Sequence, residues 1–244
     1  MIKLYNYSKL LLTKSYEDCL NLNISNNKKE YLKAKFKHSQ ETLNIACKIY
    51  NIRKEEGFLY LLHDIGRFRV VIDHVEKEDH AYYGYKYLYN KHLFDEEVLL
   101  PIMLHETDIG WEENLNALKL FQNLNKDEKD RVITNIKKLK DADILANMIV
   151  KLKNTKIEGG LNSDIYNCLL NGKICEKDYV GAINRAIYII SGVYILSTPE
   201  GLSFVKESGL IKKYLDKVIK KSGKGNLKDK LLKCKECLIE KGYI

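Results

Sequence analysis

The chain has 244 residues, of which 45% are hydrophobic and 30% are charged, and its formal net charge is +8 at pH 7. This composition excludes a fibrous or disordered chain and predicts a globular protein with a substantial core. Lysine supplies most of the positive charge, and no basic patch is interleaved with stacking aromatics. A solvated surface is therefore favoured over a nucleic-acid face, and phosphorylated small molecules also fit.

The cysteines and the apolar segments predict a cytoplasmic protein with no membrane partner. Six cysteines are scattered along the chain and no signal peptide is recognised, which favours reduced thiols. The longest apolar run, AIYIISGVYIL at 186–196, is about half as long as a membrane span and predicts a buried helix. Cys234 and Cys237 have the spacing of a metal knuckle, but no second pair accompanies them and they are interpreted as structural.

Helical spacing dominates the first third of the chain. Apolar residues recur at intervals of three and four from Asn27 to Arg53, which predicts a long helix. The segment EEGFLYLLHDIG, residues 55–66, predicts a short helix that Gly66 ends in the left-handed conformation. Residues 67–79, RFRVVIDHVEKED, lack sustained helical periodicity and predict a polar loop.

More helices are predicted downstream. One begins at His80, and another follows Asp95, which can cap it. Pro101 should kink that second helix or mark its first turn. After a loop through Trp111, residues 127–153 predict one long helix. The tail predicts three further helical segments, within 178–196, 203–221 and 227–241, and a turn at 220–226.

Several polar residues lie where an apolar face is expected. On the long helix Asp143 shares one face with apolar residues, namely Val132, Ile136, Leu139 and Ala146. A carboxylate there must be protonated, paired with a base or bound to a cation. Asp141 points toward lysines instead and is expected to be solvated. His63 and Asp64 follow LYLL, and His105 follows PIML.

Each of these signals alone also fits a satisfied core residue or a chance His-Asp pair. One arrangement accounts for all of them, namely imidazole nitrogens and carboxylate oxygens around a divalent transition metal. The motifs resemble those of the HD-domain metal-dependent phosphohydrolases over residues 34–150. The likeness rests on KHSQETLNIA with His38, LLHDIG with His63 and Asp64, and LKDADILANM with Asp143. Within that family the chain is most similar to the subgroup that carries HDIGRF.

This resemblance implies an all-α HD-domain helical bundle in a single domain, 1–244, with a metal-binding core at 34–150 and further helices at 151–244. It implies one or two divalent ions, with manganese, iron, cobalt, nickel, zinc and magnesium all admissible. The implied ligands are His38, His63, Asp64 and Asp143 for one ion, and His80 and His105 with Asp64 for the other. His74 competes with His80, which is favoured because small residues follow it at a helix start, and His92 is interpreted as a surface residue.

The implied reaction is hydrolysis of a phosphomonoester or phosphodiester, of a nucleotide or related metabolite, by a metal-activated hydroxide. Asp64 would bridge the ions and Arg67 would hold the phosphate, with a plain surface charge as the alternative for Arg67. Lys37, beside His38, is a further candidate contact for the anionic substrate. Glu106 and Asp108 either accept hydrogen bonds from ligating histidines or lie in solvent.

Two other functions remain open from the sequence. Imidazole-carboxylate sites also suit iron, so a di-iron oxygenase of HD type is the first alternative. A non-catalytic helical module that binds nucleic acid is the second, and it would show strongly salt-dependent affinity.

Overall fold

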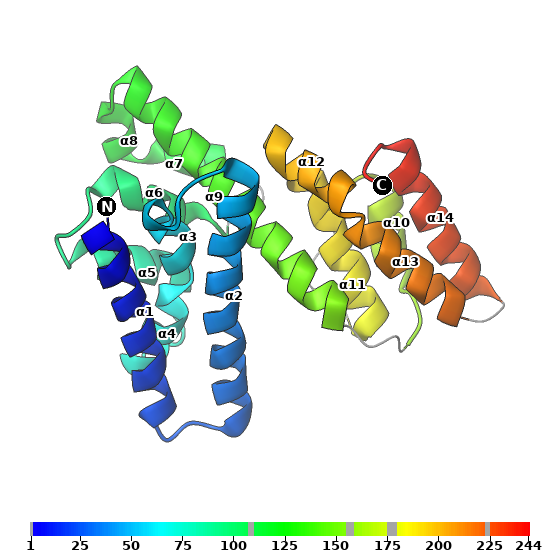
Figure 1. Ribbon diagram of the computed structural model, residues 1–244, viewed down its shortest axis with the longest axis horizontal. Helices are drawn as coiled ribbons and strands as arrows, with labels where there is room; N and C mark the ends of the chain where they lie inside the picture. Colours follow the sequence, from blue (N-terminus) through cyan, green and yellow to red (C-terminus); the bar gives the residue numbers. More distant parts are fainter. Residues whose placement is uncertain (1, 107–109, 155–158, 175–179, 223–224) are drawn as a thin grey trace. The chain divides into compact units, whose positions relative to one another are not determined.

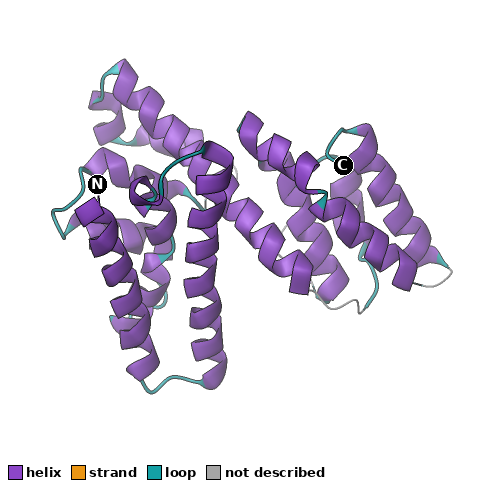
Figure 2. Cartoon of the chain, viewed as in Figure 1, coloured by secondary structure: helices purple, strands orange, loops and turns teal. Residues whose placement is uncertain are grey.

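The computed structural model describes residues 2–106, 110–154, 159–174, 180–222 and 225–244. The regular elements in these ranges are helices, with no strand among them (Figure 2), which confirms the all-α prediction. The chain divides into two compact units, Met1–Asp143 and Ile144–Ile244. The division falls within one long helix, close to residue 150, where the sequence predicts that the metal-binding core ends.

The first unit contains the residues that the motifs predict as metal ligands, and its helices are labelled in Figure 1. Its helices are α1 (Ile2–Asn21), α2 (Asn26–Tyr50), η1 (Lys54–Glu56), α3 (Phe58–Leu62), α4 (Ile65–Ile72), α5 (His80–Tyr89), α6 (Glu96–Leu104), α7 (Trp111–Ala117), α8 (Lys119–Asn123) and the first part of α9 (Lys126–Asn154). Helix α4 packs against α1 and α5, and α5 packs against α6. Helix α4, which follows the His-Asp pair, thus packs directly against α5, which carries the candidate ligand His80.

The predicted helices at 27–53, at 80 and at 127–153 are confirmed as α2, α5 and α9. Ser25 caps α2 by accepting a hydrogen bond from the Lys28 amide, and Asp79 caps α5 in the same way. Asp95 precedes α6, but its side chain makes no cap hydrogen bond. Pro101 lies inside α6, so the alternative that it marks the first turn is wrong.

The predicted loop at 67–79 and the predicted cap at Gly66 are wrong, because α4 runs from Ile65 to Ile72 and contains Gly66. Gly66 does not adopt a positive φ. A Cβ atom at this position would lie 1.8 Å from the His80 carbonyl oxygen and 2.7 Å from the Gly84 amide nitrogen. The glycine therefore permits a close approach of α4 and α5 and does not end a helix.

Helices α1, α7 and α8 are additions that the sequence reasoning did not predict. The buried face of α1 includes Ser8, Ser15 and Cys19, so its apolar periodicity is weak. Helices α7 and α8 are short, and they are held by a local core rather than by an extended amphipathic stripe. That core contains Leu100, Leu104, Trp111, Leu115, Phe121, Val132 and Ile136.

The second unit is also helical. Its elements are the remainder of α9, α10 (Ser163–Leu170), α11 (Ala182–Ser191), η2 (Gly192–Ile195), α12 (Pro199–Ser208), α13 (Leu210–Lys221) and α14 (Asn226–Glu240). Ile187 and Ile190 are fully buried, which confirms that the apolar run forms a buried helix. Cys234 is buried within α14, as the structural interpretation expects. Among the described helices, none combines the length and apolar character that a membrane crossing needs.

The two units differ in charge. The 41 basic and 33 acidic residues of the chain divide into 23 and 23 in residues 1–143, and 18 and 10 in residues 144–244. The first unit is therefore electrically balanced, and the whole net charge of +8 belongs to the second. An excess of basic groups anywhere in the first unit is then a local feature and not a consequence of overall composition.

Candidate metal centre

One face of α2 leads from the surface to the centre of the first unit. Tyr31, Lys35, His38 and Thr42 follow one another at intervals of four, three and four residues, so they share a side of the helix. Tyr31 is exposed, Lys35 is half-buried, and His38 and Thr42 are buried. The Thr42 hydroxyl donates to the His38 carbonyl oxygen at 3.0 Å, deep in the fold. Helix α2 thus presents a tyrosine, a lysine and an imidazole in order of increasing depth.

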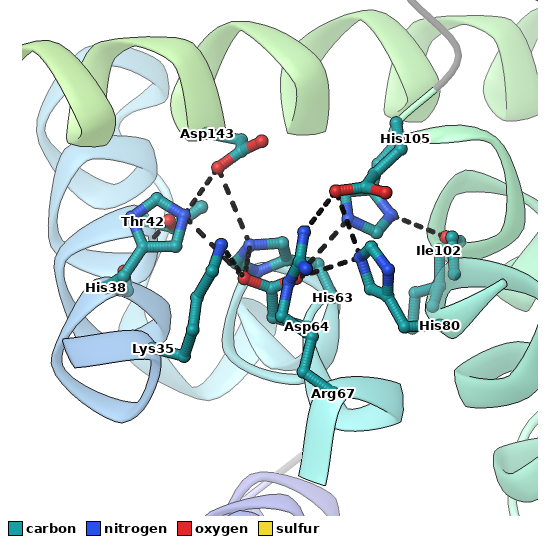
Figure 3. A network of polar contacts seen from close by, with 12 residues as sticks. Lys35, His38, Thr42, His63, Asp64, Arg67, His80, Ile102, His105 and Asp143 are labelled. Carbon is teal, nitrogen blue, oxygen red and sulfur yellow. Dashed lines mark hydrogen bonds and ion pairs between the residues drawn. The ribbon is translucent and has the colours of Figure 1, made fainter. Parts of the chain in front are cut away.

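His63 and Asp64 occupy the junction between α3 and α4 (Figure 3). His63 is the last residue of helical conformation after α3, and Asp64 has φ −96° and ψ 12°, outside the helical conformation. Consecutive residues on a continuous helix point about 100° apart. The break in the helix lets both side chains point into the same cluster, where both are buried.

His80 enters the cluster because of the close approach of α4 and α5. It is the first residue of α5, and Asp79 fixes that helix start by accepting hydrogen bonds from the amides of Ala81 and Tyr82 at 2.7 and 3.1 Å. Gly66 places its backbone against the His80 carbonyl group. The imidazole Nε2 of His80 consequently lies 3.4 Å from Asp64 Oδ1.

The remaining members come from α6 and α9. His105 follows α6 directly, and its Nε2 lies 3.7 Å from Asp64 Oδ1. Glu106, the next residue, contacts Arg67 and lies 3.0 Å from His80 Nε2. On α9, Asp143 Oδ1 lies 2.5 Å from His38 Nε2 and 3.7 Å from His63 Nε2.

The histidine tautomers suit metal ligation. His63 Nδ1 lies 2.8 Å from the Tyr60 carbonyl oxygen, and His105 Nδ1 lies 2.7 Å from the Ile102 carbonyl oxygen. A carbonyl oxygen can only accept, so both Nδ1 atoms carry a proton, and in the neutral imidazole each Nε2 then has a free lone pair. His63 Nε2 is buried with no hydrogen-bond partner among the described residues. Backbone carbonyls commonly orient metal-bound imidazoles in this way.

The two carboxylate oxygens of Asp64 face two different sets of imidazoles. Oδ2 lies 4.0 Å from His38 Nε2 and 3.6 Å from His63 Nε2, whereas Oδ1 faces His80 and His105 at 3.4 and 3.7 Å. Two ligand atoms that each lie about 2.1 Å from one ion are at most about 4.2 Å apart. Each set therefore fits around one ion, and Glu106 falls within the set of His80 and His105. The buried cluster can hold a divalent metal.

The cluster is anionic apart from two basic side chains. Lys35 Nζ donates to Asp64 Oδ2 at 2.9 Å, and Arg67 Nε donates to Asp64 Oδ1 at 2.6 Å. Burial raises the pKa of Asp64, but Lys35 and Arg67 outweigh it and hold that pKa well below its usual range. Burial likewise raises the pKa of Glu106, but His80 and Arg67 bring it down to about 2. The pKa of Asp143 is also well below its usual range, because His38 and His63 outweigh burial.

These shifts leave three ionised carboxylates at neutral pH, on Asp64, Glu106 and Asp143. Lys35 and Arg67 form ion pairs with the two oxygens of the central carboxylate, one with each. The pKa of each basic group is raised, since its carboxylate neighbours outweigh the effect of burial. The residues present therefore fit a cation site that is rich in oxygen and nitrogen donors.

The structure brings together all six histidine and aspartate side chains that the motifs single out, and Arg67 with them. It places the competitors elsewhere, because His74 and His92 are both exposed. Asp108 lies outside the described residues. The expectation that Asp141 is solvated is wrong, since this side chain is fully buried. The spacing argument considered only one face of α9, but the helix is covered on more than one side.

Lys35 and Tyr31 are not among the site residues predicted from the sequence. Lys37, predicted because it is adjacent to His38, is exposed, whereas Lys35 contacts Asp64. Tyr31 accepts a hydrogen bond from Arg67 Nη1 at 2.9 Å. Helical spacing would have found both residues, since they lie three and seven positions before His38 on one face of a correctly predicted helix.

Comparison with known proteins supports the motif-based resemblance. Residues 36–148 match the family model described as HD domain. No curated protein and no solved structure matches the chain. The matched segment contains all the residues of the cluster except Lys35 and Tyr31.

Proposed function

Since residues 36–148 form an HD domain, we propose that this protein is a metal-dependent phosphohydrolase that cleaves a phosphomonoester or phosphodiester, of a nucleotide or related metabolite. The observation that carries this proposal is the position of Asp64. Its two oxygens face separate imidazole pairs at distances that suit one ion on each side. Bound there, divalent ions would supply Lewis-acid polarisation of phosphoryl oxygens and a water of lowered pKa.

In this proposal some residues of the cluster bind the metal ions and others orient the ligands. His38, His63 and Asp64 would hold one ion, and His80, His105 and Asp64 would hold the other, with Glu106 as an additional ligand or acceptor. Asp143, which lies 2.5 Å from His38 Nε2 and 3.7 Å from His63 Nε2, would join the first set. Carbonyl groups of Tyr60 and Ile102 fix His63 and His105 so that Nε2 faces the ions. The metal identity stays open among the ions that accept mixed nitrogen and oxygen donors.

Lys35 and Arg67 would bind the phosphoryl group. Both reach Asp64 from the solvent side of the cluster, and both side chains are partly exposed, at 19% and 18%. With Asp64 engaged as a ligand, the two cationic side chains would be free to donate hydrogen bonds to phosphoryl oxygens. The guanidinium group can hold two such oxygens, and Tyr31 and Glu106 keep it oriented.

The proposed activity is tested with protein loaded with manganese, assayed for release of phosphate or alcohol. The substrates are a panel of nucleoside phosphates together with p-nitrophenyl phosphate and bis-p-nitrophenyl phosphate. We expect hydrolysis of at least one class, and its loss when EDTA removes the ions. Full metal occupancy without hydrolysis would contradict the proposal. Oxygen uptake after anaerobic loading with iron would favour the oxygenase alternative instead.

The neighbouring lysines of α2 provide a matched test of the phosphate contact. Lys35→Gln should lower kcat/KM about 10- to 100-fold, because a charged hydrogen bond contributes about 1.5–3 kcal/mol. Lys37→Gln removes the same charge from the same helix and should change kcat/KM by less than about twofold. Steady-state kinetics on the best panel substrate measures both. Equal losses in the two variants would show that only overall charge matters.

A further inference from the structure

A hollow lies in the first unit, outside the candidate metal centre. It has a volume of about 390 Å³ and is formed by α1, by Arg69 of α4, by Tyr87 of α5 and by Lys91 in the turn after α5. The α1 side is lined by Tyr7, Leu10, Leu11, Lys14, Ser15 and Asp18. Its volume falls in the range of small-molecule sites. The hollow is called the α1 groove below.

Helix α4 separates this groove from the metal centre. Arg67 and Arg69 are two positions apart on α4, so their side chains leave the helix about 200° apart. Arg67 reaches Asp64, and Arg69 lines the groove. One short helix thus supplies an arginine to each of two sites.

The groove is locally basic. Lys14, Arg69 and Lys91 line it together with one acidic residue, Asp18, and a second carboxylate, that of Asp73, pairs with Arg69. The first unit as a whole has equal numbers of basic and acidic residues, so this excess is not a consequence of a lysine-rich composition. Lys91 Nζ and the Arg69 guanidinium lie 5.0 and 4.5 Å from the centre of the Tyr87 ring, so both charges lie near this lining residue.

Arg69 is fixed in place before any ligand binds. Its Nη2 donates to Asp73 Oδ1 at 2.6 Å, and the Tyr83 hydroxyl donates to the other oxygen of Asp73 at 3.0 Å. The Nε of Arg69 is buried and has no hydrogen-bond partner among the described residues. A buried donor without an acceptor costs about 1–3 kcal/mol. The ion pair with Asp73 holds the guanidinium group where Arg69 lines the groove.

Part of the α1 side of the groove is apolar. Tyr7 and Leu10 are 36% and 63% exposed there, and Leu11 is buried. We propose that the α1 groove binds a small organic anion whose phosphate or carboxylate head lies at Arg69 and Lys91 and whose apolar body covers Leu10. This proposal does not depend on the hydrolase activity.

The test uses full-length protein in EDTA and isothermal titration with three probes: phenylphosphonate, benzoate and inorganic phosphate. Phenylphosphonate cannot be hydrolysed, so turnover does not interfere. We expect saturable one-to-one binding of phenylphosphonate or benzoate, and the tighter of the two identifies the head group. Inorganic phosphate, without an apolar body, should bind at least about tenfold more weakly. Equal affinity for inorganic phosphate would overturn the role of the apolar wall.

Variants locate the binding. The double variant Lys14→Gln/Lys91→Gln should weaken binding by about tenfold or more, since both are surface side chains whose loss leaves the fold intact. Lys9→Gln, an exposed lysine of α1 outside the groove, and Arg67→Gln, in the metal centre, should leave affinity unchanged. Loss of binding in Arg67→Gln with full binding in the double variant would assign the ligand to the metal centre. No saturable binding of any probe up to about 10 mM would also overturn the proposal.

Discussion

Replacing Asp64 by Asn is expected to reduce the bound metal from two ions to at most one per chain and to reduce phosphoester hydrolysis by more than about 100-fold. Asp64 is the residue whose two oxygens face the two imidazole pairs, at 3.4–4.0 Å. An amide has one oxygen and no charge, so it cannot serve both ions. Residues that merely orient metal ligands already cost 10- to 100-fold when mutated, so a shared ligand should cost more.

Metal content by mass spectrometry and hydrolysis by steady-state kinetics give two separate readouts for this variant. Asp95→Asn is the matched control, because Asp95 is exposed and its side chain makes no cap hydrogen bond. Asparagine also caps helices as well as aspartate does. The control should retain both ions and full activity. Two bound ions in Asp64→Asn, with activity near that of the parent protein, would show that the carboxylate is not shared.

The centre of the site could be predicted from the sequence because some of its ligands lie where apolar residues are expected. His63, Asp64 and His105 follow apolar runs, and a polar group there needs compensation. Motif resemblance then supplied His38 and His80, whose own surroundings in the sequence are polar. All of these side chains meet in the structure. The order of the ligands along the chain could not show that the two oxygens of Asp64 face two different pairs of histidines.

The contacts of the basic residues could not be derived in the same way. Lys35 and Lys37 lie on the same helix in a lysine-rich segment, and composition does not distinguish them. The two residues differ in the side of the helix on which they lie. Lys35 lies on the same side as His38, whereas Lys37 points to solvent. Asp141 shows the converse error, because the lysines near it in the sequence suggested solvent but other elements bury it. Tertiary packing overrode the local pattern at both positions.

The helix boundaries that were predicted wrongly involve a glycine and several short helices. The prediction that Gly66 ends a helix assumed that it adopts a positive φ. In the structure it instead allows the backbones of α4 and α5 to approach closely. Residues 67–72 were then expected to form a loop, although they continue α4. Short helices such as α7 and α8 carry too few turns to show a clear period.

The close approach at Gly66 predicts a large loss of stability in Gly66→Ala, of about 3 kcal/mol or more. The new methyl group would lie 1.8 Å from the His80 carbonyl oxygen, and backbone atoms cannot rotate away as a side chain can. Overpacking against flexible side chains already costs about 1–3 kcal/mol. Relief requires α5 to move away from α4, and because His80 is the first residue of α5, the same movement takes its imidazole from Asp64. Stability and metal binding should therefore fall together.

Urea unfolding followed by circular dichroism measures the loss of stability, and alanine substitutions at two further glycines provide comparisons. Gly84→Ala places its methyl group 3.0 Å from the Gly66 amide nitrogen, a milder clash that should cost about 1 kcal/mol and yield folded protein for metal analysis. Gly160→Ala has no atom within 4 Å and should change the unfolding free energy by less than about 0.5 kcal/mol. The expected order of loss is Gly66, then Gly84, then Gly160. If Gly66→Ala were as stable as Gly160→Ala, the tight contact between α4 and α5 would not exist, and the position of His80 beside Asp64 would need another cause.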